Sequence, residues 1–254
     1  MIFDTHAHYD DEAFDEDREV LLESFPEHGI EAAVNIGADL AGTQATLDLT
    51  AAYPYIYGAA GVHPASVEEL NEEKMEWLRK ISKEPKIVAI GEIGLDYYGE
   101  EPNRELQKYW FSRQVNLARE AKLPMSIHSR DAAADTLDLL KAENAQEIGG
   151  VIHCFSYGVD MAKEYLNMGF FIGIGGVITF KNAKKLKEVV AYAPIDRLVL
   201  ETDCPYLAPE PYRGKRNSSL NLPYVAAAIA QIRGIDEAEV IAITGENAKK
   251  LYHL

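Results

Sequence analysis

Residues 1–10 read MIFDTHAHYD, and this stretch places two histidines at the end of a short apolar run. Ile2 and Phe3 favour a β-strand, and His6 and His8 follow at its carboxyl end. Side chains two residues apart on a strand point to the same face of the sheet. A His-x-His pair in this position can supply half of a metal site, so we ask which later residues supply the other half.

Seven more short apolar runs follow along the chain, rich in Ile and Val and without the alternation of a half-exposed sheet. Runs of this kind are typical of parallel strands that are covered on both faces. The eight predicted strands are residues 2–5, 31–36, 56–61, 87–91, 124–128, 150–154, 170–174 and 197–201.

Stretches with helical periodicity separate most of these strands and close the chain. They cover residues 12–28, 66–83, 103–122, 131–144, 160–168, 182–192, 221–233 and 236–253, with a capping box predicted at residues 66–69. Strands that alternate with helices over about 250 residues are typical of a (β/α)8 TIM barrel. An open doubly wound sheet is the alternative. No linker or repeat divides the chain, so we expect one domain over residues 1–254.

The charge limits the class of partner. The formal net charge is −16, and nearly all of the acidic excess lies in residues 1–101. An acidic surface repels phosphates at long range, which argues against a wide DNA-coating face and leaves room for a local basic patch. No apolar run reaches the roughly 20 residues of a membrane span, and the first residues have no basic region of the kind that opens a signal peptide, so we expect none. We therefore expect a cytoplasmic protein with no membrane association and no obligate protein partner.

Metal-binding residue types gather at the predicted carboxyl ends of the strands. Five of the seven histidines and two carboxylates lie at or just after such ends: His6, His8, His63, Glu92, His128, His153 and Asp203. A TIM barrel brings these ends together at the face that carries its active site. Imidazole and carboxylate ligands suit Zn²⁺, Mn²⁺ or iron, and Mg²⁺ where carboxylates and water dominate.

More than four candidate ligands indicates two ions. Glu92 stands in the middle of the strand order, so we expect it to bridge them. Paired ions polarise a phosphoryl or carbonyl group and activate water, and Asp203 is then the expected general base.

The sequence resembles the TatD-type metal-dependent deoxyribonucleases of the metal-dependent hydrolase superfamily. The matching motifs are DTHAH (4–8), GVHP (61–64), GEIGLDYY (91–98), HSRDA (128–132), HCFS (153–156), ETDCPYLAP (201–209), RGKRN (213–217) and ENAKKLY (246–252). The resemblance implies one divalent ion on His6, His8, Glu92 and Asp203, and a second on Glu92, His128 and His153.

The resemblance also implies a function. His63 would contact the substrate phosphate. The activity would be Mg²⁺- or Mn²⁺-dependent hydrolysis of phosphodiester bonds in DNA, trimming single-stranded ends in the 3′-to-5′ direction, although Zn²⁺, Ni²⁺ or iron could also be bound. DNA ends would bind locally at the barrel mouth. The family usually continues RGKRN with Glu-Pro, whereas this chain has Ser218 and Ser219.

Basic residues near the expected site offer further contacts. Arg130 follows His128 closely, and Arg213 follows Asp203, so we expect both to bind substrate phosphate. Gly173, Gly175 and Gly176 could form a phosphate loop or could only permit a tight turn. The alternative function is a two-metal hydrolase of amides, lactones or phosphotriesters. Such enzymes often carry a modified lysine on strand four, where this chain has Glu92.

Overall fold

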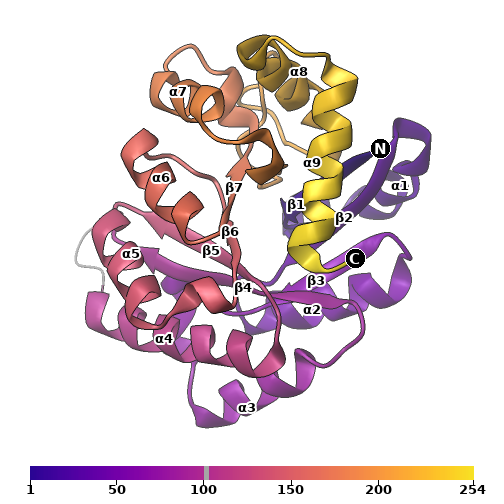
Figure 1. The fold of residues 1–254 in the computed structure, drawn as a ribbon. Coiled ribbons are helices and arrows are strands. Elements are labelled where there is room, and N and C mark those ends of the chain that lie inside the picture. The colour runs from indigo at the N-terminus through magenta and orange to yellow at the C-terminus, as the bar shows by residue number, and fades with distance from the viewer. Residues whose placement is uncertain (100–102) are drawn as a thin grey trace.

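The computed structural model describes residues 1–99 and 103–254, and in this part of the chain eight parallel strands form one sheet (Figure 1). Each strand pairs with its sequence neighbours. The strands are β1 (Ile2–Ala7), β2 (Ile30–Ile36), β3 (Ile56–Ala60), β4 (Ile87–Asp96), β5 (Met125–Arg130), β6 (Gly150–Ile152), β7 (Phe171–Ile174) and β8 (Leu198–Leu200).

The sheet is closed at its two edges by hydrogen bonds between β1 and the segment after β8. The backbone N–H of His8 donates to the carbonyl of Cys204 (2.9 Å), and the N–H of Asp203 donates to the carbonyl of His6 (2.9 Å). This closure confirms the predicted TIM barrel and rules out the open sheet. It also brings the first and last predicted metal ligands side by side.

Helices cover the outside of the barrel (Figure 1). They are α1 (Arg18–Glu23), α2 (Leu40–Ala52), α3 (Glu72–Ile81), α4 (Arg104–Ala121), α5 (Ala133–Ala142), α6 (Val159–Asn167), α7 (Lys184–Tyr192), α8 (Leu222–Arg233) and α9 (Glu237–Tyr252). The last helix packs on β1 and β8, and its Tyr252 hydroxyl donates to the carbonyl of Thr5 (2.7 Å). This contact between the two ends of the chain supports our proposal of one domain over residues 1–254. No helix in the described parts of the chain is long and apolar enough to cross a membrane.

Two helix predictions are wrong. The predicted helix over residues 12–28 is three short pieces, the 3-10 turns η1 (Glu12–Phe14) and η2 (Pro26–His28) with α1 between them. Pro26 has no N–H to continue α1. Residues 66–69 form no capping box, because they lie in the 3-10 turn η3 (Pro64–Glu69). Helix α3 is capped instead by Asn71, whose side chain accepts from the N–H of Lys74 (3.0 Å).

Two other elements differ from the expected pattern. Helix α2 was not predicted, because threonines rather than large apolar residues occupy its buried face. Strand β4 does not end at Gly91 but runs on to Asp96, so Glu92 lies within it. Consequently Glu92 is held by the sheet rather than by a loop, and its side chain is almost fully buried.

Candidate metal centre

Four predicted ligands converge at one point on the carboxyl-terminal face of the barrel. The Nε2 atoms of His6 and His8 are 3.1 Å apart. Glu92 Oε2 lies 3.5 Å from His6 Nε2 and 3.6 Å from His8 Nε2. Asp203 Oδ1 lies 3.7 and 3.4 Å from the same two nitrogens. Ligand atoms at the corners of a tetrahedron with bonds of about 2.0–2.2 Å are about 3.3–3.6 Å apart, so this donor set fits one metal ion.

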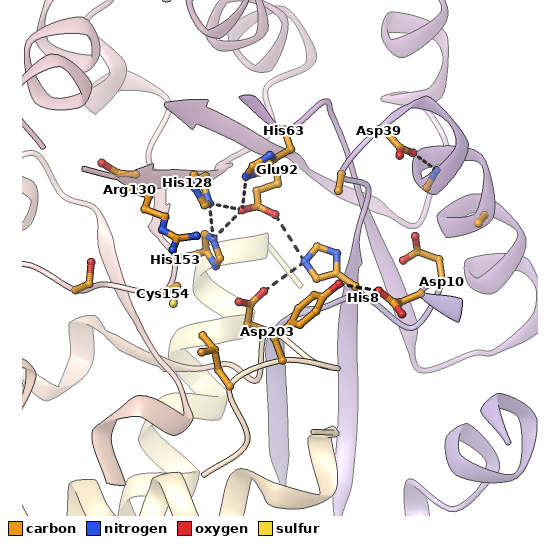
Figure 2. A pocket seen from close by; sticks show the side chains of 18 of the residues that line it. His8, Asp10, Asp39, His63, Glu92, His128, Arg130, His153, Cys154 and Asp203 are labelled. Carbon is orange, nitrogen blue, oxygen red and sulfur yellow. Dashed lines mark hydrogen bonds and ion pairs between the residues drawn. The ribbon is translucent and has the colours of Figure 1, made fainter. Parts of the chain in front are cut away.

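The other carboxylate oxygen of Glu92 faces a second group of nitrogens (Figure 2). Glu92 Oε1 lies 2.7 Å from His128 Nδ1 and 2.8 Å from His153 Nε2, and these two nitrogens are 3.3 Å apart. Glu92 therefore presents one oxygen to each of two adjacent donor groups. The structure brings together all six of the expected ligands.

The acids and bases of the site shift one another's pKa values strongly. Burial raises the pKa of Glu92, yet the surrounding histidines hold it well below its usual range. Burial lowers the pKa of His8, but Asp203 and Glu92 raise it to about 9. Burial and the neighbouring His153 lower the pKa of His6 to about 4. Carboxylates thus stay ionised while protons occupy some of the imidazoles, which is the arrangement expected where metal and proton compete for the same nitrogens.

Neighbouring groups orient three of the four imidazoles. His8 Nδ1–H donates to the carbonyl of Ile36 (2.9 Å), which leaves its Nε2 lone pair facing the centre. His128 Nε2 lies 3.1 Å from Asp96 Oδ2, and His6 Nδ1 lies 3.1 Å from Ser126 Oγ. Such outer contacts fix the tautomer and the ring orientation of metal-binding histidines. Ser126 was missed in the sequence, although it lies two residues before His128 on β5 and so shares its face.

The fourth imidazole, His153, lies above a buried carboxylate. Its Nδ1 is 4.0 Å from Glu201 Oε1, and Glu201 accepts the N–H of Cys154 through the same oxygen. Burial raises the pKa of Glu201 to about 8. The carboxylate occupies the space beside Gly173, where an added Cβ would lie 2.1 Å from Glu201 Oε2. Gly173 therefore makes room for Glu201, which favours close packing over a phosphate loop.

His63 lies beside this centre with a different orientation. Its Nδ1 accepts the N–H of Ala65 (3.1 Å), so the proton of the neutral ring is on Nε2. That Nε2 lies 3.8 Å from Glu92 Oε1. Burial lowers the pKa of His63 to about 4, which keeps the ring neutral at pH 7. His63 is thus a hydrogen-bond donor at the edge of the centre rather than a lone-pair ligand.

The two predicted phosphate-binding arginines differ in their placement. Arg130 lines the cavity over the centre, and its guanidinium stacks 3.7 Å above the ring of Tyr98. Arg213 is exposed, stacks on Phe180 at 4.2 Å and does not line that cavity. The neighbouring Arg216 is engaged elsewhere, because it forms a bidentate ion pair with Asp17 (2.6 Å each).

The residues that depart from the family pattern do not line the cavity. Ser219 is fully buried, and its hydroxyl donates to Asp4 Oδ2 (2.6 Å) and contacts the Tyr9 hydroxyl (2.8 Å). Asp4 also accepts from Thr202 (2.7 Å). This network ties β1 to the loop after β8 beneath the site, so the departure bears on how the loop is anchored.

Above the centre lies a cavity of about 870 Å³. Its walls include His8, His63, Glu92, His128, His153 and Asp203, together with Asp10, Asp39, Arg130 and Tyr206. Within the described residues, three sets of side chains, two of which share His6, bring ligand atoms within 4.8 Å of one another: His6–His8–Asp203, His6–His153–Glu201 and His63–Glu92–His128. The chain therefore has acid and histidine clusters able to hold metal at the floor of a large cavity.

The comparison with known families agrees with this geometry. The family model described as TatD related DNase matches residues 3–253. The chain belongs to the TatD family. A Bacillus subtilis relative, the uncharacterized metal-dependent hydrolase YabD, is 42% identical over 254 residues and covers all of both chains. The resemblance seen in the motifs is thus confirmed, and the protein is a TatD-family metal-dependent hydrolase.

Two further relatives extend the comparison. The 3′-5′ ssDNA/RNA exonuclease TatD of Erwinia tasmaniensis is 33% identical over the full length of both chains. The crystal structure of YjjV, a TatD homolog from Escherichia coli K12, superposes with a TM-score of 0.94 at 30% identity and covers 100% of this chain and 98% of the other. The phosphotriesterase homology protein of E. coli shares the fold, with a TM-score of 0.68 at 16% identity.

Proposed function

We propose that this TatD-family protein hydrolyses phosphodiester bonds at the 3′ ends of single-stranded DNA with two divalent metal ions. One observation carries the proposal: the two oxygens of Glu92 face two separate groups of ligand atoms. His6, His8 and Asp203 would hold one ion, His128 and His153 the other, and Glu92 would bridge them. Mg²⁺ or Mn²⁺ is the proposed working metal, and Zn²⁺, Ni²⁺ or iron would also fit the donors.

Such an ion pair, when bound, would polarise the phosphoryl group and lower the pKa of a water molecule. The chain's own residues supply the rest. Asp203 stays ionised because nearby histidines outweigh the effect of burial and lower its pKa. Its carboxylate is therefore ready to take a proton from the attacking water, which makes it the proposed general base.

His63 and Arg130 are the proposed substrate contacts. The neutral ring of His63 can donate from Nε2 to a phosphate oxygen without competing for metal. The in-plane N–H groups of Arg130 stay available because Tyr98 contacts only the face of its guanidinium. The placement of Arg213 outside the cavity means that it could reach only a phosphate away from the cleaved bond.

The test uses protein stripped of metal and reconstituted with Mg²⁺, Mn²⁺, Zn²⁺, Ni²⁺ or Fe²⁺. A 5′-labelled single-stranded DNA with a free 3′ hydroxyl should shorten one nucleotide at a time in the presence of metal. Asp203→Asn should lose most of this turnover while keeping its fold, since Asn tolerates the positive φ of 56° at this position. Turnover near the wild-type level in this variant would remove Asp203 as the base.

The same metal series on amides, lactones and phosphotriesters tests the alternative function. Strand β4, with the sequence IVAIGEIGLD, contains no lysine that could be modified to bridge two ions. We therefore expect hydrolysis of DNA to exceed that of the small esters. Metal-dependent hydrolysis of a lactone or phosphotriester without any DNA cleavage would overturn the proposal.

A further inference from the structure

The walls of the cavity differ in charge from one side of the metal centre to the other. Asp10 and Asp39 lie on the side of His8, whereas Arg130 lies beyond His128 and His153 (Figure 2). A polyanion is repelled by the first side and attracted by the second. A nucleic acid strand therefore cannot leave the cavity over the β1–β2 wall without passing these two carboxylates.

The exit between β8 and β1 is spanned by a side-chain contact. The hydroxyl of Tyr206, which lines the cavity, donates to Asp11 Oδ2 (2.9 Å). This bond joins the loop after β8 to the loop after β1. The Asp11 carboxylate is thus the third on the acidic side of the cavity. Its charge repels a nucleic acid strand from this exit.

The rim beyond β7 and β8 has the opposite character. Residues 181–187 contain four lysines, and the loop after β8 adds Arg213 and Lys215. Lys184 lies 4.0 Å from Glu188, whereas Arg216 pairs with Asp17 on the β1 side and is not part of this rim. Arg213 forms no ion pair with any described residue. In a chain of net charge −16 this rim is a local basic patch.

Aromatic rings lie in the same region. The guanidinium of Arg213 stacks on Phe180, and the rings of Tyr212 and Tyr224 meet edge to face with centroids 5.4 Å apart. Tyr212 is 42% exposed and Tyr224 is 39% exposed. Exposed aromatic rings beside basic side chains are the means by which proteins hold single strands, since every base offers a face for stacking.

A chain of contacts connects this rim to the cavity. Leu207 and Val177 line the cavity, and the segment after Leu207 packs on η5 (Gly176–Thr179), where the N–H of Glu210 donates to Thr179 Oγ1 (2.9 Å). Phe180 follows directly, and helix α8, which carries Tyr224, packs on η5. The rim is thus continuous with the cavity wall.

We infer that Tyr212, Arg213 and Tyr224 form a track for the single-stranded DNA that leads into the metal centre, with the buried Phe180 holding the Arg213 guanidinium in place. The inference rests on the proposed function. The 3′-terminal nucleotide enters the cavity, and the strand on its 5′ side runs over the β7–β8 rim. Bases stack on the two tyrosines, and Arg213 binds a backbone phosphate on the 5′ side of the cleaved bond.

The test compares the KM of a thymidine dinucleotide with that of a thymidine octanucleotide, using metal-loaded enzyme. The octanucleotide should have the lower KM, because only it reaches the track. Tyr212→Ala and Tyr224→Ala should each raise the octanucleotide-to-dinucleotide KM ratio by about fivefold or more, the effect of losing one stacked base. Arg213→Ala should reduce the slope of log(1/KM) against log salt for the octanucleotide by about 0.7, the value for one phosphate contact on a single strand.

Tyr192→Ala is the matched control. Tyr192 is 49% exposed and ends α7, which places it at the opposite end of the barrel from the cavity. The octanucleotide-to-dinucleotide KM ratio of Tyr192→Ala should equal that of the wild type. If neither oligonucleotide is cleaved, the proposed function itself fails. If both are cleaved with equal KM, or if the tyrosine variants match Tyr192→Ala, the track is wrong and the proposed function stands.

Discussion

Replacing Asp96 by Asn should weaken one of the two proposed metal sites and leave the other unchanged. Asp96 Oδ2 lies 3.1 Å from His128 Nε2, and the Asp96 side chain is 16% exposed. Asn can accept the same hydrogen bond through its amide oxygen, so the substitution removes mainly the negative charge. Loss of such an outer carboxylate costs about 10- to 100-fold in metal affinity, or about 1.4–2.7 kcal/mol.

The pH at which affinity is measured decides how large the effect appears. Burial lowers the pKa of His128, but Asp96 and Glu92 raise it to about 9. At pH 7 a proton therefore occupies His128 in most metal-free molecules, and the metal must displace it. Asp96→Asn lowers this pKa and so relieves the competition. We expect the full loss of affinity at pH 9 and a smaller loss at pH 7.

Isothermal titration of metal-stripped protein with Mn²⁺ at both pH values measures this effect. Asp138→Asn, an exposed substitution on α5, is the control and should bind as the wild type does. Equal affinity of Asp96→Asn and wild type for both ions at pH 9 would refute the role given to Asp96.

Three further outcomes follow from the contacts around the site. Gly173→Ala should destabilise the fold by about 1–3 kcal/mol in urea unfolding, since its Cβ would meet the Glu201 carboxylate; an unchanged midpoint would show that Glu201 is free to move. Ser219→Ala should lower the unfolding free energy by about 1–3 kcal/mol, because Asp4 loses a buried donor, and a neutral effect would count against the network. For the ion held by His8, whose pKa is raised to about 9, apparent affinity should rise by about tenfold for each pH unit from 7 to 9 and then level off; a flat profile would mean that no proton is displaced.

The sequence was sufficient to predict the barrel because each strand is an apolar run and the strands alternate with helices. The sequence was also sufficient to predict which residues come together as candidate metal ligands, since the carboxyl ends of the strands meet at one face of a barrel. The lengths of the elements were harder to predict. Strand β4 continues past Gly91 because β5 pairs with it as far as Asp96, and pairing of this kind leaves no mark in the strand's own composition.

Other features depend on contacts between distant residues. Helix α2 turns threonines toward the barrel, where Thr43 donates to the carbonyl of Gly61 (3.0 Å), so its buried face does not look apolar. The tautomer of His63 follows from one backbone contact to Ala65. The placement of Arg213 on Phe180, outside the cavity, depends on how the loop after β8 packs on η5. None of these pairings can be inferred from spacing along the chain.

The central claim is that Glu92 joins two metal ions on one face of the barrel. The most direct test is anomalous scattering from crystals of the protein loaded with Mn²⁺. The account predicts two peaks about 3.5–4 Å apart, with one Glu92 oxygen bound to each. One peak should also contact His6, His8 and Asp203, and the other His128 and His153. A single peak, or two peaks of which only one contacts Glu92, would contradict the account.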